Sequence, residues 1–196
     1  MFIRPRVLLL LLVALVALVA LRPGAPARGA SSRPTPAYVV ADLGVLPGGD
    51  TSAAAGINDR GQVVGYAYMA HGRRRAFRTS ATGTLATPGA DLGGLPRSPY
   101  SEARGINARG QIVGFVYAGT LEGPLRVRAF VYDDAATPRM RDLNSLIPAG
   151  SGIVLEEAGG INDAGQIAAT GTVHGREHAF RLTPVGLARP MATPTR

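Results

Sequence analysis

The chain has 196 residues, a formal charge of +8, no cysteine and no tryptophan. This length fits a single domain, and the absence of cysteine excludes a small scaffold held by disulfides. Every basic residue is an arginine, and four of the 21 lie before residue 31, so 17 basic face 13 acidic residues in the remainder. This small surplus, with one short cluster at Arg73–Arg75, argues against nucleic acid as the main partner.

Residues 1–30 are predicted to be a secretory signal peptide. Arg4 and Arg6 precede an apolar run from Val7 to Leu21, and small residues and prolines follow. An uncleaved membrane anchor is the alternative, although fifteen apolar residues fall short of the about 20 that a spanning helix needs. We therefore expect a secreted or cell-surface protein, which contacts a membrane only if this segment is retained. Residues 31–37 are expected to be a linker.

A ten-residue sequence that begins with Gly-Ile-Asn-x-x-Gly-Gln occurs three times in the rest of the chain. It begins at Gly56, at Gly105 and at Gly160, so the copies start 49 and 55 residues apart. An Asp-Leu pair precedes each copy and an Ala-Phe pair follows it, which divides the chain into repeats of about 38–88, 89–138 and 139–184. We expect a structural role for the recurring residues, which are Asp42, Asn58, Gly61, Phe77, Asp91, Asn107, Gly110, Phe130, Asp142, Asn162, Gly165 and Phe180.

Each repeat is predicted to consist of about four β-strands. The Asn-x-x-Gly segment has the composition of a tight turn between strands, as between residues 52–57 and 62–68. A second hairpin leads into the strand whose phenylalanine anchors the core, and the Asp-Leu segment, residues 38–43 in the first repeat, supplies another strand. Residues 185–196 are expected to form a tail.

The predicted fold is all-β, with three tandem four-stranded meanders that resemble propeller blades. Because propellers typically have about four to eight blades, three repeats imply a partial or small ring. A pseudo-threefold fold of the β-trefoil type is the alternative. An open arc would leave unpaired strand edges, so a homo-oligomer is a further hypothesis.

The repeats resemble the extracellular HAF family, named for its His-Ala-Phe motif. The similarity covers residues 37–182 and depends mainly on the Gly-Ile-Asn-x-x-Gly-Gln core. Only the third copy has the literal motif, at His178–Phe180, whereas arginine replaces histidine in the first two. The resemblance implies a secreted or surface β-repeat protein and supplies no catalytic residue.

The residues suggest no catalytic, cofactor or metal site. Because Asp42, Asp91 and Asp142 occupy one recurring position, we expect them to cap turns rather than to act as acids or bases. Calcium at the turn carboxylates Asp59 and Asp163 is disfavoured, because each turn offers a single carboxylate and calcium takes many oxygen ligands. The three histidines, His71, His174 and His178, lack further ligands at a telling spacing.

The favoured function is a non-catalytic module that binds an extracellular glycan or protein. Its contact surface is expected in the variable loops at residues 68–75, 117–126 and 144–156. A secreted hydrolase is the alternative, with a carboxylate pair drawn from the unrepeated Glu102, Glu122, Glu156 and Glu157. A purely structural envelope component is the third hypothesis.

Overall fold

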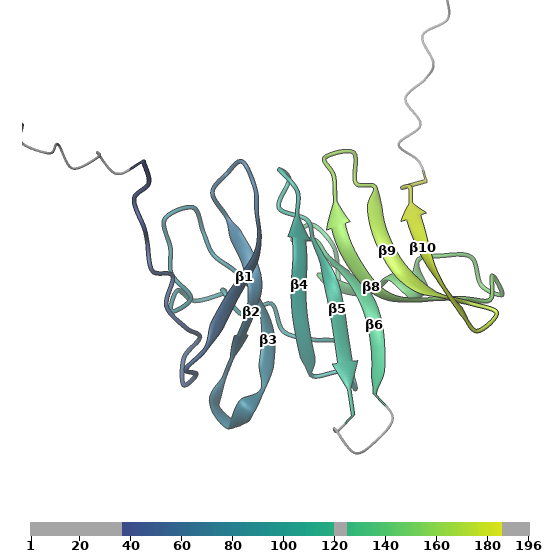
Figure 1. Ribbon diagram of the computed structural model, residues 1–196, viewed down its shortest axis with the longest axis horizontal. Helices are drawn as coiled ribbons and strands as arrows, with labels where there is room; N and C mark the ends of the chain where they lie inside the picture. The colour runs from purple at the N-terminus through teal and green to yellow at the C-terminus, as the bar shows by residue number, and fades with distance from the viewer. Residues whose placement is uncertain (1–36, 120–124, 186–196) are drawn as a thin grey trace, which may run out of the picture. The chain divides into compact units, whose positions relative to one another are not determined.

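The computed structural model describes residues 37–119 and 125–185, which form β-strands with two single 3-10 turns (Figure 1). The all-β prediction is confirmed. The predicted signal peptide, most of the linker, Glu122 and most of the tail lie outside these residues. In chain order the elements are β1 (Ser52–Ile57), β2 (Val63–Tyr68), η1 (Ala70–Gly72), β3 (Arg74–Arg78), β4 (Tyr100–Ile106), β5 (Ile112–Ala118), β6 (Arg126–Tyr132), β7 (Met140–Asp142), η2 (Leu143–Ser145), β8 (Ile153–Ile161), β9 (Ile167–Val173) and β10 (Arg176–Leu182).

The strands form three antiparallel sheets. The first sheet has the order β1-β2-β3, the second β4-β5-β6-β7 and the third β10-β9-β8. The second sheet lies between the other two (Figure 1). The described residues close neither a barrel nor a ring, and they include no helix with the length and apolar character to cross a membrane.

The recurring Asn-x-x-Gly segment is the turn between the first two strands of each sheet. Gly61, Gly110 and Gly165 have φ values of 72°, 85° and 77°, in the left-handed region that glycine enters without a Cβ penalty. In each turn the glycine N–H donates to the asparagine carbonyl three residues earlier, over 2.9 Å. One local sequence therefore produces the same hairpin in all three sheets.

The prediction of a strand at residues 38–43, and with it of four strands in every repeat, is wrong. The sheets have three, four and three strands, and residues 37–46 contain no strand. The Asp-Leu segment instead pairs with the last strand of the sheet that precedes it: Asp142 in β7 lies opposite Phe130, and Asp91 forms a single bridge with Phe77. Within residues 37–119 and 125–185 no sheet precedes Asp42, so the first such segment joins no strand there.

The core lies between the sheets. Val64 and Ala76 of the first sheet pack with Ile112, Val116 and Phe130 of the second, and all five are fully buried. The opposite face of the second sheet packs on the third through a separate cluster, comprising Val113, Ala129, Val131, Leu143, Leu155, Ala158, Ile167 and Ala169. Each inter-sheet interface thus buries its own apolar layer, which is the main source of stability in a chain without disulfides.

The outer face of the first sheet, which points away from the second sheet, is covered by residues from the loops of the same chain. Leu46 and Leu85, each 1% exposed, pack there with Phe77 and Ala67. Leu43 contacts the same cluster, and its carbonyl accepts a hydrogen bond from the Leu85 N–H over 2.9 Å. The first sheet is therefore capped, whereas β10 at the other end is exposed along most of its length.

Candidate binding site

Five aromatic side chains of the first and second sheets form a half-buried group that we call the aromatic cluster. Tyr66 and Tyr68 belong to β2, Tyr100 to β4, and Phe115 and Tyr117 to β5. Residues two apart on a strand share a face, and Tyr100 lies directly opposite Tyr117. Four of the six tyrosines of the chain are thus placed here.

The rings of the cluster contact one another in defined orientations. Tyr100 and Tyr117 are stacked, with their centroids 5.0 Å apart and an angle of 14° between their planes. Phe115 is 6.1 Å from Tyr117, and Tyr66 meets Tyr68 edge to face at 6.2 Å. Such contacts restrict ring motion, so partly exposed aromatic faces are presented in fixed positions.

Arg74, the first residue of β3, lies among these rings. Its guanidinium carbon is 4.5 Å from the Tyr66 centroid and 5.0 Å from that of Tyr68. The guanidinium donates hydrogen bonds to the Tyr68 hydroxyl and to the Glu102 carboxylate. Burial alone would lower the pKa of Arg74, but these bonds and the charge of Glu102 outweigh it and raise that pKa above its usual value. Arg74 is thus a fixed cation that links the first and second sheets.

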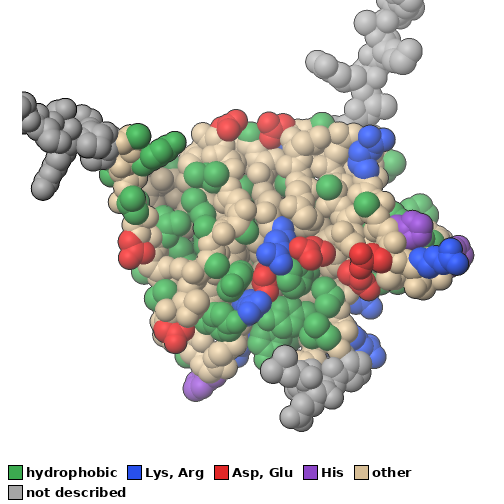
Figure 2. Space-filling model, viewed as in Figure 1, with side chains coloured by type: hydrophobic (Ala, Val, Ile, Leu, Met, Phe, Trp, Pro, Cys, Tyr) green, Lys and Arg blue, Asp and Glu red, His purple; other side chains and the backbone are tan. Residues whose placement is uncertain are grey.

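A chain of ion pairs continues from Glu102 to the third sheet. Glu102 in β4 is 3% exposed, and its Oε2 lies 3.7 Å from Nη2 of Arg104. The Arg104 Nε lies 2.9 Å from Oε1 of Glu157 in β8, and its guanidinium stands 5.1 Å from the Phe115 centroid. Figure 2 shows apolar side chains gathered beside arginine and acidic side chains on this face. The Glu102 carboxylate is thus buried between the guanidinium groups of Arg74 and Arg104, as a buried charge requires.

The hydroxyl of Tyr117 is in a less polar environment than a surface tyrosine. Burial raises its pKa, and the nearby charge of Arg74 opposes that effect without cancelling it. Tyr117 therefore keeps its proton at neutral pH and acts as a neutral donor or acceptor. Together with Arg74 and Glu102 it gives the aromatic cluster polar groups beside apolar ring faces.

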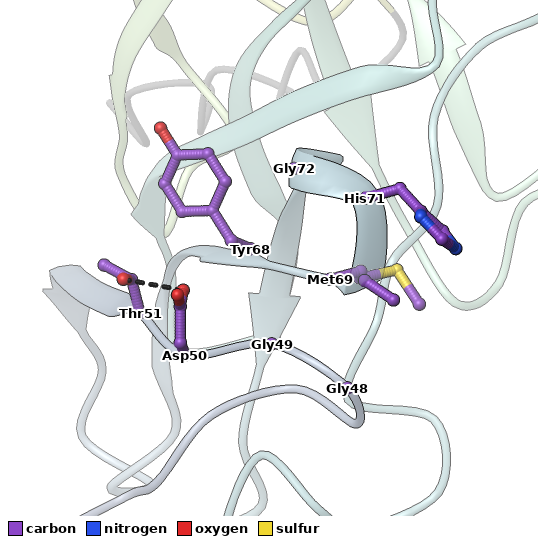
Figure 3. A pocket seen from close by; sticks show the side chains of 9 residues that line it. Gly48, Gly49, Asp50, Thr51, Tyr68, Met69, His71 and Gly72 are labelled. Atoms are coloured by element: carbon purple, nitrogen blue, oxygen red, sulfur yellow. Dashed lines mark hydrogen bonds between the residues drawn. The ribbon is translucent and has the colours of Figure 1, made fainter.

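An open hollow of about 400 Å³ lies beside the cluster (Figure 3). It is bordered by the loop at residues 48–51 and by the segment from Tyr68 to Gly72. The Asp50 carboxylate accepts a hydrogen bond from the Thr51 hydroxyl, and the His71 ring points away from the hollow in this view. Since much of its lining is glycine backbone, the hollow adds room next to Tyr68 and little chemistry of its own.

The recurring asparagines form a ladder through the three turns. Each asparagine side-chain N–H₂ donates to the glutamine Oε1 four residues later in its own turn. The same group of Asn58 donates to the Asn107 carbonyl over 2.9 Å, and that of Asn107 to the Asn162 carbonyl over 3.1 Å. Neighbouring turns are thereby bonded to one another at the ends of the sheets.

The other recurring residues lie apart from the aromatic cluster. Asp42, Asp91 and Asp142 each accept a hydrogen bond from the backbone N–H two residues later, over 2.8–2.9 Å. Phe77 and Phe130 are at most 1% exposed in the core, and Phe180 packs against the core cluster of the third sheet. These positions serve the backbone and the core.

The histidines are also separate from the cluster. His71 and His174 occupy turns at positive φ, 65° and 51°, and the His178 ring lies 6.3 Å from that of Phe180. Within residues 37–119 and 125–185, no three histidine or acidic side chains group as metal ligands would. Asp163 accepts a hydrogen bond from the Ala108 N–H over 2.8 Å, which ties it to the second turn.

The aromatic cluster was not predicted from the sequence. Glu102 and Glu157 were candidate site residues, and the structure joins them through Arg104. A signal was present, because Tyr66, Tyr68, Phe115 and Tyr117 occupy matching alternate positions four and six residues after the turn glutamines. The third repeat has Thr170 and Thr172 there, so the aromatic surface is confined to two sheets.

Comparison with known proteins places the chain in a family without assigning an activity. A family model described as a protein of unknown function, DUF3466, matches residues 48–183. The chain therefore belongs to this family, and the match spans all three sheets. No curated protein and no solved structure matches it significantly.

Proposed function

We propose that the protein is an exported, non-catalytic carbohydrate-binding module, built as part of a β-propeller. The aromatic cluster carries the proposal, since it joins partly exposed aromatic rings to fixed hydrogen-bonding groups. The C–H groups on one face of a sugar ring are weakly positive and pack on the negative face of an aromatic ring. Arg74 and the tyrosine hydroxyls offer donors and acceptors to sugar hydroxyls at the rim of the same surface, and Glu102 holds Arg74 from below.

The propeller proposal is supported by the close approach of the first strands of the sheets. A Cβ placed on Gly56 would lie 3.6 Å from the Gly105 Cα, and one on Gly105 would lie 3.1 Å from the Gly160 Cα. Strands β1, β4 and β8 therefore come together backbone to backbone, as the inner strands of blades do around a common axis. Each sheet is, on this proposal, one blade.

A hydrolytic role is less well supported. A glycosidase needs one carboxyl group that donates a proton to the leaving oxygen and a second that acts as nucleophile or base. Glu102 is engaged by two arginines and Glu157 by one, so both carboxylates already have cationic partners within the protein. The proposed site binds without reacting.

Glycan arrays probed with the purified chain would test the binding proposal. Tyr100→Leu and Tyr117→Leu keep apolar bulk but remove a ring face, and we expect each to weaken binding at least tenfold. Tyr117→Phe, the matched control, keeps the ring and should retain binding within a few-fold.

Three results would overturn the proposal. The first is the absence of glycan binding by a folded chain, and the second is equal binding by the leucine variants. The third is glycan cleavage by the wild-type chain that Glu102→Gln abolishes, which would establish the hydrolase instead. Binding to a protein array alone would assign the cluster to a protein partner.

A further inference from the structure

We propose that the segment at residues 38–43 completes the third sheet of a second copy, so that two chains close a six-bladed ring. The inference rests on the proposed blade architecture and is independent of the ligand at the aromatic cluster. It follows from two features of the described part of the chain, which are a segment that pairs with no strand and a strand edge, β10, that has no partner.

The edge is β10, which pairs with β9 alone among the described strands. In the second sheet the equivalent strand β6 gains β7, with Asp142 opposite Phe130. In the first sheet β3 gains the segment around Asp91, opposite Phe77. Phe180 of β10 is the third phenylalanine of this series, and no aspartate lies opposite it within the described residues.

The segment that fits this edge is the one around Asp42. It has the sequence Tyr38-Val39-Val40-Ala41-Asp42-Leu43, which is typical of a strand. Tyr38, Val39 and Val40 are 87%, 98% and 91% exposed. An apolar, strand-forming segment so exposed is a candidate for addition to an open sheet edge.

The register follows from the first sheet. There the Arg78 N–H donates to the Ala90 carbonyl over 2.9 Å, and the Leu92 N–H donates to the Ala76 carbonyl over 3.0 Å. The same register at β10 joins the Arg181 N–H to the carbonyl of Ala41, and the N–H of Leu43 to the Ala179 carbonyl. Asp42 then faces Phe180, as Asp91 faces Phe77.

An apolar hollow beside β10 is suited to the incoming segment. It has a volume of about 610 Å³, and its lining includes Ile147, Ile153, Phe180 and Leu182. Between the first two sheets, Met140 of β7 is 7% exposed and packs in the core. Val40 precedes Asp42 by the same two residues as Met140 precedes Asp142, so it would enter this hollow.

The partner must be a second copy rather than the same chain. Leu43 is packed on the outer face of the first sheet, with the second sheet between it and β10. Asp42, its direct neighbour, therefore does not reach Phe180 of its own chain. Two copies joined head to tail at both ends give six blades, within the range of about four to eight that propellers use, and the ring closes with twofold symmetry.

The first and third turns have complementary hydrogen-bonding groups, as a contact between the third sheet of one copy and the first sheet of the other requires. Within the described residues, the Asn162 side-chain N–H₂ has no acceptor in a following turn, and the Asn58 carbonyl has no donor from a preceding one. Between the second and third turns of one chain, the Asn107 side-chain N–H₂ donates to the Asn162 carbonyl, and the Ala108 N–H donates to the Asp163 carboxylate. The corresponding bonds of the third turn would run to Asn58 and Asp59 of the second copy.

The mass of the full chain in solution, expressed with its own N-terminal segment so that processing takes place, tests the proposal. Light scattering should give the mass of two chains at high concentration. Val40→Lys charges the proposed strand without touching the core and should shift the mass to one chain. Leu125→Lys, at an exposed apolar residue away from both ends, should leave it unchanged.

Paired cysteines test the register, because the native chain has none. Ala41→Cys with Arg181→Cys places the two thiols on directly opposed residues, about 5.5 Å apart between Cα atoms, within disulfide range. We expect mild oxidation to give a covalent dimer with two bonds. Val39→Cys with Arg181→Cys is displaced by two residues and should cross-link much more slowly.

Four outcomes would overturn the proposal. They are a single-chain mass at all concentrations, a mass that grows beyond two chains, a disulfide within one chain, and equal cross-linking of the two cysteine pairs. Glycan binding by a single-chain variant such as Val40→Lys would still support the proposed function, so the two proposals fail independently.

Discussion

The turn asparagines combine several structural roles in one short side chain. The side-chain oxygen of Asn107 accepts hydrogen bonds from two backbone N–H groups. Its side-chain N–H₂ donates to the Gln111 side chain and to the backbone carbonyl of the next turn. It is 3% exposed, so water cannot replace these partners. Asn162 makes the same bonds to Gln166 but is exposed, and no further turn follows it up to residue 185.

We therefore expect Asn107→Ala to destabilise the protein more than Asn162→Ala. Leaving buried backbone groups without partners costs about 1–3 kcal/mol for each, so Asn107→Ala should lower the free energy of unfolding by about 3 kcal/mol. Asn162→Ala should cost about 1 kcal/mol. Urea denaturation followed by circular dichroism measures both variants, and equal losses would contradict the assigned ladder.

Within each sheet, the first pair of strands is bulged, and a glycine lies opposite a bulge in every sheet, as Gly171 lies opposite Leu155 in the third. The register shifts between Ala54 and Gly56 and between Ala103 and Gly105, opposite Gly65 and Gly114. A Cβ on Gly114 would lie 2.0 Å from the Glu102 carbonyl oxygen. The bulge bends the strand and increases its twist, and the glycine makes room for the displaced backbone.

Gly114→Ala should accordingly disrupt the second sheet. The added methyl group meets backbone rather than a flexible side chain, so we expect a loss of about 3 kcal/mol, at the upper end for an overpacked site. Gly159→Ala is the matched control, because a Cβ there meets nothing within 4 Å. Thermal unfolding should separate the two variants, and similar midpoints would show that the bulge relaxes around the methyl group.

The hairpins were predictable because their determinants are local. The Asn-x-x-Gly spacing specifies the turn, and alternation specifies the flanking strands, so β1 and β2 agree with residues 52–57 and 62–68 to within one residue. The fourth strand was mispredicted because its partner is a strand of the preceding repeat, a non-local feature. The aromatic cluster was missed for a similar reason, since Tyr100 meets Tyr117 only once β4 and β5 are in register.

At the scale of the molecule, the main contacts between the described sheets join sheets that are neighbours in sequence. The second sheet is buried on both faces, by Val64 and Ala76 on one side and by Leu155 and Ile167 on the other. The third sheet ends in β10, whose residues are mostly exposed. Stability in such linear arrays is a sum of unit and interface contributions, so the end units open first.

Hydrogen exchange should therefore be graded along the chain. Backbone amides of β5 should exchange most slowly, close to the rate set by global unfolding, and those of β10 fastest among the strands. Exchange followed by mass spectrometry of peptides, at a concentration low enough to favour single chains, measures this gradient. Uniform protection from β1 to β10 would instead indicate one cooperative unit.

The asparagine ladder has a consequence for how such proteins change length. Each turn uses one asparagine side chain to bond the backbone of the next turn. The pattern is the same between the first and second turns and between the second and third. A tandem duplication that begins and ends at equivalent points of two repeats would insert a complete turn, together with the asparagine that bonds it to the next turn. A chain lengthened in this way would need no new kind of junction between its turns.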